Sequence, residues 1–402
     1  MEFGLTKEQL RLIDKSRTVA RDVLAVHASK YDLEAQHPIE SFAALREQGF
    51  YGMAVPKEYG GWGLDLVTYC LCMHELAQGC ASTATSFNMH NIVLYGIAHL
   101  GTEDQKKRWF SKVINEGALI GSWGSEPNAS FSSARRSLGT SIVETDGGYR
   151  MSGQKYFCSL AGACDYALLF AVPASKIGQE NANDIVVGLV STKEPGVTIQ
   201  YGWDTLGLRA TSSHSVNLEN VFIKTDDFLG GPGDWFGHAC NQRFEIGYGA
   251  IYSGLARAAL DFAVRTTNGR VLRPDNIRQS DLPWVQMHIA ELSMKVEAAF
   301  LTSLQTAWEM DQGYAVAIAN SSGERAKGAA STAVLDVTSK VFEICGGSSA
   351  MRRYPAERYY RDARTQTLMG PSYDFLLQVI GRGVIAQQVI DTATPASAKV
   401  AP

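Results

Sequence analysis

The chain has 402 residues, of which 45% are hydrophobic, and its 37 Lys and Arg nearly balance its 41 Asp and Glu, which gives a formal net charge of −4. This length can bury a large core and allows two or three domains. The charge balance counts against a nucleic-acid partner, because proteins that bind phosphate backbones concentrate Lys and Arg.

The sequence also bears on the compartment. The N-terminal stretch MEFGLTKEQLRLI lacks the pattern of a secretory signal, and no apolar run reaches membrane-spanning length. The seven cysteines stand in apolar surroundings without the paired spacing of a zinc site. We therefore expect a cytoplasmic protein with buried, reduced thiols, no metal centre and no membrane contact.

Residues 1–118 are predicted to form a helical domain. Thr6 and Gln9 fit a capping box at the start of a segment with apolar residues at helical spacing. A second helix, in residues 38–50, is closed by Gly49. The segments 66–82 and 91–101 are apolar nearly all round, which is typical of buried helices.

Residues 119–229 contain short runs rich in β-branched and aromatic residues, separated by turns such as Asp146-Gly147-Gly148. They predict a compact β domain of six or more strands. Long helical segments return in residues 230–390, and the small, polar tail 391–402 is expected to be disordered. The fold class is therefore α+β, with helical, β and helical parts in that order.

Six motifs in this order resemble those of the acyl-CoA dehydrogenase superfamily of flavoproteins over nearly the whole chain. They are VPKEYGGWGLD, SEPNAS, SGQKYFCSLAGACDY, LGLRATSSHSVNLENVFI, EICGGSS and YPAERYYRDAR. The resemblance implies a barrel-like middle β domain between an N-terminal helical domain and a C-terminal four-helix bundle. It also implies bound FAD and a homotetramer, since the family shares cofactor sites between subunits.

Three residues of these motifs are candidates for contact with the flavin ring. By resemblance, the Phe157 ring lies against the flavin face and the Ser159 hydroxyl reaches N5, where a hydrogen bond would stabilise charge in the reduced ring. Ser125 resembles the residue that approaches the flavin pyrimidine. From spacing alone, Phe157 is a core residue of an ordinary strand, Ser159 stands at a turn, and Ser125 belongs to a type I turn.

A second group of residues resembles the family's contacts with the rest of FAD. Arg270 resembles the arginine that reaches the diphosphate bound to a neighbouring subunit, and the paired donors of a guanidinium suit a diphosphate. Gly346 and Gly347 would let the backbone approach a phosphate without a Cβ clash. Ser372 and Asp374 resemble a polar pair near the adenosine. Without the resemblance, an isolated arginine at a helix end is more often a capping or surface charge.

The stretch TQTLMGPS, residues 365–372, departs from the family at its central catalytic position. The family usually has a glutamate here that removes the α-proton of a thioester, but this chain has Gly370, which keeps only a backbone N–H for the thioester carbonyl. Some members carry the glutamate on the first long C-terminal helix, at a position that falls on Phe244, beside Glu245. Glu245 is therefore the candidate base, and the alternative is a first-turn glutamate favoured by the helix dipole.

Four residues are expected to line the acyl pocket. By resemblance, Asn88 and His90 lie near its floor, Phe131 stands beside SEPNAS in place of a small polar residue, and Phe244 holds the alternative base position. His90 is also the other candidate base, although a lone histidine in an apolar run is more often a core residue with satisfied ring nitrogens.

Three functions remain open. The leading hypothesis is an FAD-dependent enzyme that dehydrogenates an acyl thioester of CoA or acyl carrier protein, by α-proton abstraction and hydride transfer to flavin N5, and passes electrons to electron-transfer flavoprotein or O2. The second is a flavin monooxygenase or oxidase on the same fold that uses reduced flavin and O2. The third is a non-catalytic subunit that completes the site of another chain.

Overall fold

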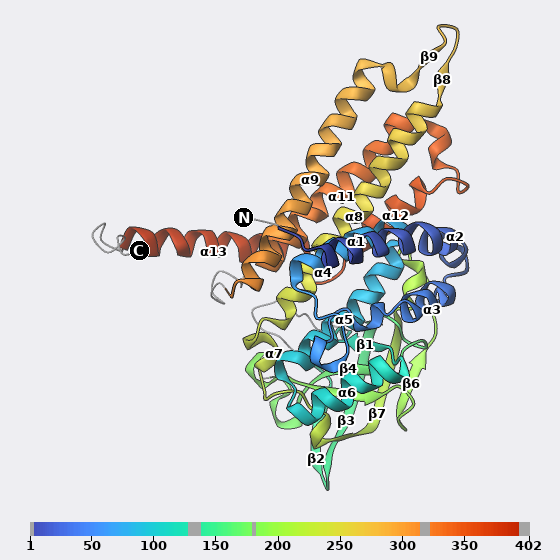
Figure 1. Cartoon of the computed structure of the whole chain (residues 1–402). Coiled ribbons are helices and arrows are strands. Elements are labelled where there is room, and N and C mark those ends of the chain that lie inside the picture. Colours follow the sequence, from blue (N-terminus) through green and yellow to red (C-terminus); the bar gives the residue numbers. More distant parts are fainter. Residues whose placement is uncertain (1–3, 128–137, 179–181, 314–321, 394–402) are drawn as a thin grey trace.

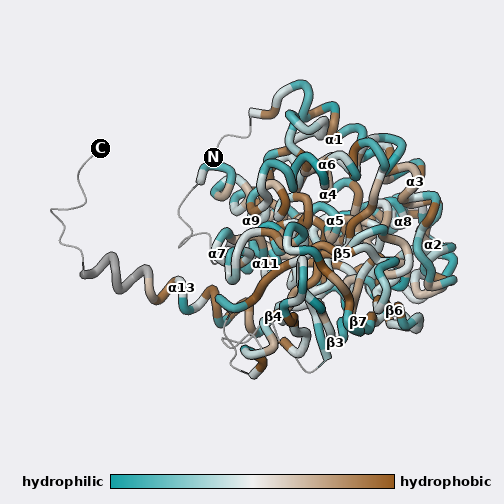
Figure 2. Tube along the Cα trace, turned by 90° about the horizontal axis from the view of Figure 1, so that it is seen from below, coloured by the Kyte–Doolittle hydropathy of each residue, from teal (hydrophilic) through white to brown (hydrophobic). Residues whose placement is uncertain are grey.

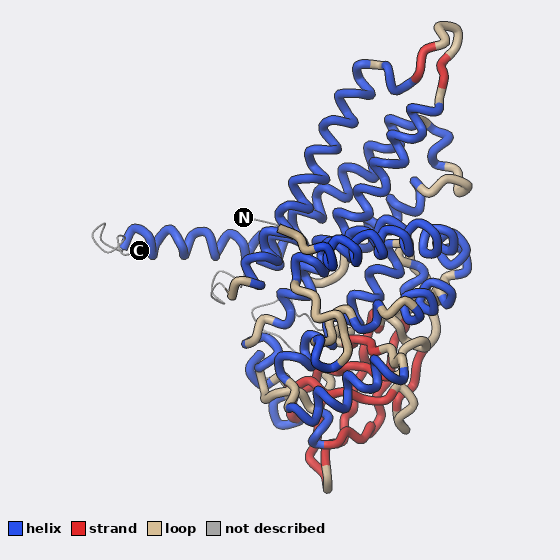
Figure 3. The backbone as a smooth tube through the Cα atoms, in the orientation of Figure 1, coloured by secondary structure: helices blue, strands red, loops and turns tan. Residues whose placement is uncertain are grey.

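The computed structural model describes residues 4–127, 138–178, 182–313 and 322–393, with side chains up to residue 386. The strands of its seven-stranded sheet gather in one part of the molecule, helices cover that part, and long helices extend from it as a bundle (Figures 1 and 3). The predicted order of helical, β and helical parts is therefore confirmed.

The N-terminal part is helical, and its central helices are buried. Its members are α1 (Lys7–Val19), α2 (Ala25–Glu34), α3 (Ile39–Glu47), α4 (Leu66–Gly79), α5 (Ala81–Leu100) and α6 (Glu103–Glu116). The Thr6 hydroxyl accepts from the Gln9 backbone and the Gln9 side chain accepts from the Thr6 N–H, which confirms the predicted capping box. Apolar α4 and α5 are buried, whereas α1 and α6 carry hydrophilic residues at the periphery (Figure 2).

The middle part is a curled sheet built around one long antiparallel pair, β3 and β7. Its strands are β1 (Ile120–Trp123), β2 (Ser141–Thr145), β3 (Gly148–Cys158), β4 (Tyr166–Pro173), β5 (Val186–Ser191), β6 (Val197–Gln200) and β7 (His214–Lys224). Their order is β1-β4-β2-β3-β7-β6, β5 pairs with β4, and only the pairs of β4 with β1 and β2 are parallel. The turn between β2 and β3 uses Gly147 at φ 71°, as its sequence predicts.

The C-terminal part is helical. Its elements are α7 (Asp234–Gly237), α8 (Cys240–Gly269), β8 (Val271–Leu272), β9 (Ile277–Arg278), α9 (Pro283–Asp311), α11 (Ser322–Cys345), α12 (Ala356–Gln366) and α13 (Tyr373–Ala393). The long helices α8, α9 and α11 lie side by side, and the β8–β9 hairpin stands at their far end (Figure 1). The domain boundaries near residues 118 and 229 remain proposals, with β1 and α7 beginning shortly beyond them.

The last helix differs from the prediction in two ways. α13 starts against α11 and then extends away from the other helices, so a single chain does not complete a four-helix bundle along its whole length (Figures 1 and 2). Leu377, Val384 and Ile385 of this helix are exposed, so its apolar side chains are not covered by the described part of the chain. α13 also continues to Ala393, three residues into the predicted tail, because the first proline of that tail is Pro395.

The described residues also bear on the cysteines, on membrane-spanning helices and on metal ligands. All seven cysteines are buried and free, as predicted. Among the described residues, no helix is long and apolar enough to span a bilayer, and no three potential metal ligands stand together.

His90 has the environment of a core residue, which is the alternative that its apolar surroundings predict. Its side chain is fully buried, Nδ1 accepts from the Ile120 backbone N–H at 3.1 Å, and Nε2 therefore donates to the Tyr51 carbonyl at 3.0 Å. Burial lowers the pKa of His90 to about 4. Both ring nitrogens thus serve to join α5 to β1 and to the Tyr51 turn, in a neutral form.

The helices α5 and α8 cross so closely that one glycine is required. Asn88 on α5 accepts from the Tyr69 hydroxyl at 2.6 Å and donates to the Phe244 carbonyl at 3.3 Å. A Cβ at Gly247 of α8 would lie 2.3 Å from the Asn88 Oδ1. This crossing joins the N-terminal helices to the C-terminal bundle.

Replacing this glycine is expected to destabilise the protein. Gly247→Ala places a methyl group against Asn88 and should lower the free energy of unfolding by about 1–3 kcal/mol, the usual cost of overpacking. Gly381→Ala is the matched control, because a Cβ at Gly381 of α13 meets nothing within 4 Å and alanine favours a helix by about 1 kcal/mol. Urea unfolding of both variants checks this, and equal effects would contradict the close crossing.

His90 predicts a specific dependence of stability on pH. The unfolded histidine takes up a proton near its ordinary pKa of 6.5 and the folded one only near 4, so the unfolded state binds more protons between these values and stability falls as the pH drops through this window. His90→Gln keeps one donor and one acceptor without the titration. Between about pH 7 and about pH 5 the wild type should lose about 2 kcal/mol more than this variant. Equal losses in unfolding measurements at the two pH values would refute the assignment.

Candidate active site

The predicted flavin-face residues Ser125 and Phe157 come together at one edge of the middle domain. Ser125 follows β1 and is exposed, and its carbonyl accepts from the Tyr156 N–H at 2.9 Å. Phe157, near the end of β3, has a left-handed φ of 55°, and its ring is 62% exposed. Its centroid lies 6.2 Å from that of Trp203, edge to face. This edge therefore presents aromatic surface that the described part of the chain leaves uncovered.

Ser159 lies inside the domain and not on that exposed edge. Its hydroxyl is 2.8 Å from that of Ser213, which is 2.7 Å from that of Thr211, and Thr211 donates to the Leu208 carbonyl at 2.9 Å. If Thr211 donates to Leu208, Ser213 donates to Thr211 and Ser159 to Ser213. This direction leaves the Ser159 oxygen as an acceptor.

A buried ion pair that the sequence did not reveal holds this edge together. Lys155 Nζ lies 2.5 Å from Glu126 Oε1 and donates to the Phe170 carbonyl at 2.6 Å. Glu126 also accepts from the backbone of Gly139 and Thr140. Burial lowers the pKa of Lys155, and Glu126 opposes that shift. Glu126 and Lys155 adjoin Ser125 and the Phe157 strand, so the pair fixes both predicted segments relative to each other.

Arg270, Gly346 and Gly347 meet at the far end of the helical bundle. The Arg270 guanidinium donates to the Cys345 carbonyl at 2.6 Å and to Ser348 Oγ at 3.0 Å. Gly346 has a φ of 76°, which favours glycine. β8, which follows Arg270 directly, lies far from β3 in Figure 1. Within one chain, Arg270, Gly346 and Gly347 therefore lie far from the flavin-face residues. Ser372 and Asp374 are exposed at the start of α13.

Glu245 is a buried residue in the second turn of α8. The first turn of this helix contains no acidic residue, so the alternative of a first-turn glutamate held by the helix dipole is wrong. A Cβ at Gly323 of α11 would lie 3.0 Å from the Glu245 Cβ. Glu245 is 4% exposed, and it therefore lies against the first turn of α11, away from solvent.

Two further charged residues of α11 complete a buried polar cluster, and sequence reasoning missed both. Glu324 accepts from Gln242 Nε2 of α8 at 3.1 Å. Lys327 Nζ donates to the carbonyls of Met369 and Pro371 at 2.8 and 2.9 Å, on either side of Gly370. The signal was present in the sequence, since Glu324 and Lys327 stand three residues apart on an otherwise apolar helix face.

Two of the predicted acyl-pocket residues, Asn88 and Phe244, lie together in the structure. Asn88 and the half-buried Phe244 are joined by a hydrogen bond, and the Phe244 and Tyr248 ring centroids are 4.4 Å apart. Tyr248 in turn lies under the Lys327 ammonium at 5.4 Å. Asn88, Phe244, Glu245 and Gly370 thus belong to one region, whereas Phe131 lies outside the described residues.

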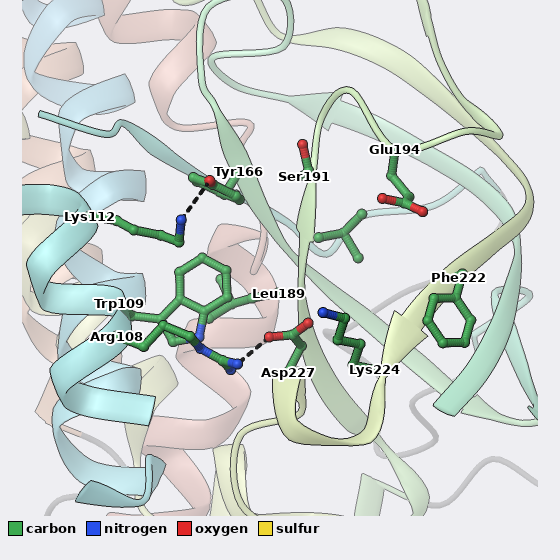
Figure 4. A pocket seen from close by; sticks show the side chains of 11 residues that line it. Arg108, Trp109, Lys112, Tyr166, Leu189, Ser191, Glu194, Phe222, Lys224 and Asp227 are labelled. Atoms are coloured by element: carbon green, nitrogen blue, oxygen red, sulfur yellow. Dashed lines mark hydrogen bonds and ion pairs between the residues drawn. The ribbon is translucent and has the colours of Figure 1, made fainter. Parts of the chain in front are cut away.

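A separate cavity of about 350 Å³ lies between α6 and the middle sheet (Figure 4). Arg108 pairs with Asp227 at 2.7 Å, and Lys112 donates to the Tyr166 hydroxyl at 3.1 Å. None of the residues predicted from the sequence lines this cavity. It therefore adds nothing to the candidate active site.

The sequence matches three family descriptions in chain order. They are the N-terminal, middle and C-terminal domains of acyl-CoA dehydrogenase, which match residues 6–117, 121–221 and 246–369.

Individual proteins agree with this assignment. The chain is 30% identical to the mitochondrial short-chain specific acyl-CoA dehydrogenase of Bos taurus, over 95% of this chain and 90% of that protein. It is 28% identical to a probable acyl-CoA dehydrogenase of Bacillus subtilis, over 97% and 100%. It is also 28% identical to the dibenzothiophene monooxygenase of Rhodococcus qingshengii, over 81% and 82%.

Solved structures share the fold. Butyryl-CoA dehydrogenase of Megasphaera elsdenii superimposes with a TM-score of 0.88 at 24% identity, over 96% of this chain and all of that chain. A dibenzothiophene monooxygenase of Paenibacillus in complex with FMN and indole gives a TM-score of 0.84 at 24% identity, over 94% and 97%. At this identity the two structures support the fold alone. Together with the three matched domains, they lead to one conclusion: the chain belongs to the acyl-CoA dehydrogenase family of flavin-dependent enzymes.

Proposed function

We propose that this enzyme is an FAD-dependent dehydrogenase of an acyl thioester, carried on CoA or acyl carrier protein, with Glu245 as its base. The observation that carries the proposal is the buried carboxylate of Glu245, which lies in the same polar cluster as the turn around Gly370. A base in this family must be shielded from water, because desolvation moves the pKa of a carboxyl group toward neutrality. Glu245 meets that requirement from α8.

The aromatic edge of the middle domain fits a flavin. The exposed Phe157 ring offers the apolar face that a flat ring system would cover, and Ser125 is exposed in the segment bonded to the backbone of Tyr156. Ser159, two residues after Phe157, is buried behind this edge with its hydroxyl bonded to that of Ser213. When bound, the flavin supplies the acceptor for the hydride that leaves the substrate.

Arg270 and its neighbours support the dinucleotide form of the cofactor. A guanidinium beside Gly346 and the open backbone at Gly347 suit a diphosphate, which FAD has and FMN lacks. Since these residues lie far from Phe157 within one chain, they would serve a flavin bound to another subunit (Figure 1). The exposed apolar residues of α13 are consistent with such contacts, and a homotetramer is the assembly we propose.

In this proposal Glu245 removes the α-proton of the thioester. The α C–H bond breaks, its electron pair stays on carbon, and the proton passes to a carboxylate oxygen. Asn88 fixes the backbone of the preceding residue through its bond to the Phe244 carbonyl, so the start of α8 is held against α5. Electron-transfer flavoprotein or O2 is the proposed electron acceptor.

A monooxygenase of the same fold is the second candidate. It is favoured by the similarity to dibenzothiophene monooxygenases over four fifths of the chain and by the glycine at position 370. A non-catalytic subunit is the third, because the two groups of cofactor residues lie apart in one chain. The buried carboxylate of Glu245 favours dehydrogenation over both.

Anaerobic titration of the FAD-loaded protein with a panel of acyl-CoAs tests the proposal. We expect at least one of them to bleach the visible flavin band. Glu245→Gln should slow bleaching by about 100-fold or more, since removing a general base costs two to four orders of magnitude. Glu297→Gln, an exposed residue on α9, is the matched control and should bleach at the wild-type rate.

Moving the carboxylate sharpens the test. A Cβ at Gly370 would meet nothing within 4 Å, so the Gly370→Glu variant starts from an unobstructed backbone position. Adding it to Glu245→Gln should restore part of the rate by supplying a base at the family's usual position. A band that bleaches equally well in wild type and Glu245→Gln would refute the assigned base. A band that no acyl-CoA or acyl carrier protein thioester bleaches would refute dehydrogenation and favour the reaction of reduced flavin with O2.

A further inference from the structure

Lys327 is a lysine almost without solvent contact, and it lies beside the turn in which this chain has Gly370 where the family usually has a glutamate. It lies in the second turn of α11 and is 1% exposed. Its Nζ donates to the carbonyls of Met369 and Pro371, the two residues that flank Gly370. The face of the Tyr248 ring, 5.4 Å away, adds a cation–π interaction. The turn 369–371 is therefore tied to α11 by one ammonium group.

Two buried carboxylates interact with this ammonium. Glu245 comes from α8, and Glu324 comes from the first turn of α11, where the helix N-terminus also favours a negative charge. Burial lowers the pKa of Lys327 to about 8, and the two carboxylates oppose that shift. The two accepting carbonyls and the two carboxylates favour the charged ammonium form of Lys327. The neighbouring phenols of Tyr248 and Tyr252 stay neutral, because burial raises their pKa values well above the ordinary range.

We propose that Lys327 is the positioning residue of this site: its ammonium holds the turn 369–371 in place and balances the charge of Glu245, so that a buried carboxylate can act as the base. The second half of this inference rests on the proposed function. The first half, that Lys327 holds the turn 369–371 in place, does not depend on the proposed function.

The charge balance explains why one lysine can serve two carboxylates. A carboxylate taken out of water without a nearby cation is strongly disfavoured in its ionised form. With Glu245, Glu324 and Lys327 all ionised, the cluster carries one net negative charge. When Glu245 takes the α-proton, that charge falls to zero, so the cluster is suited to accept one proton.

Lys327 is not itself the base. As an ammonium it has no lone pair, and two of its N–H groups already donate to backbone carbonyls. Its effect on the reaction passes through the turn and through Glu245.

Two replacements of Lys327 test the proposal against a control on the same helix. Lys327→Met removes the charge and the hydrogen bonds, Lys327→Arg keeps the charge, and Lys340→Met removes a half-buried lysine whose partner is Glu343. Hydrogen exchange of residues 366–373 is followed by mass spectrometry in the FAD-loaded protein without acyl-CoA. Exchange there should be about tenfold or more faster in Lys327→Met, because two charge-assisted hydrogen bonds are lost. Lys340→Met should leave it unchanged.

The second readout is the pH at which anaerobic bleaching reaches half its maximal rate. Without the cation, ionised carboxylates are disfavoured, so this midpoint should rise by about one pH unit in Lys327→Met and stay near the wild-type value in Lys327→Arg. Glu324→Gln removes a negative charge from the cluster and should lower the midpoint. If Lys327→Met does not fold, the pH midpoints of bleaching in Glu324→Gln and Lys327→Arg test the role of Lys327 in its place.

The outcomes separate this inference from the proposed function. Unchanged exchange in folded Lys327→Met, or a midpoint unmoved by both Lys327→Met and Glu324→Gln, overturns the role of Lys327. If no thioester bleaches the wild-type flavin, the proposed function fails, and the exchange measurement alone decides whether Lys327 holds the turn.

Discussion

The candidate site depends on the cost of burying charge between α8 and α11. Glu245, Glu324 and Lys327 are all removed from water, and each would be unfavourable in its ionised form without the others. Their mutual attraction fixes how α11 sits on α8, and the carbonyls of Met369 and Pro371 join the following turn to the same ammonium. The position of the turn that carries Gly370 is thus set by a side chain more than forty residues earlier in the chain.

A buried ion pair also joins two segments of the middle domain. The Lys155–Glu126 pair is buried between the segment after β1 and the strand that carries Phe157. The hydrogen bonds from Gly139 and Thr140 satisfy the rest of the Glu126 carboxylate. Because removing one partner of a buried pair leaves an uncompensated charge, such pairs determine geometry more than they add stability. The pair therefore ties the segment of Ser125 to the strand that carries Phe157.

The sequence predicted local structure well where a feature depends on neighbouring residues. The Thr6 capping box and the Gly147 turn formed as expected, since each is decided within a few residues. His90 could not be assigned, because its partners Tyr51 and Ile120 are 39 and 30 residues away. The course of α13 was also missed, since helical spacing predicts a helix but not the surface on which it packs.

By itself, the sequence determined the fold class, the family motifs and the absence of a carboxylate at position 370. These follow from periodicity, turn chemistry and residue identity, which are local properties. Only the tertiary structure decided that Glu245 is buried beyond the first turn of α8 and that Lys327 reaches the Gly370 turn. The reason is physical: the charge state of a side chain depends on solvent exclusion and on partners brought near by packing, and neither is encoded in the spacing of residues along the chain.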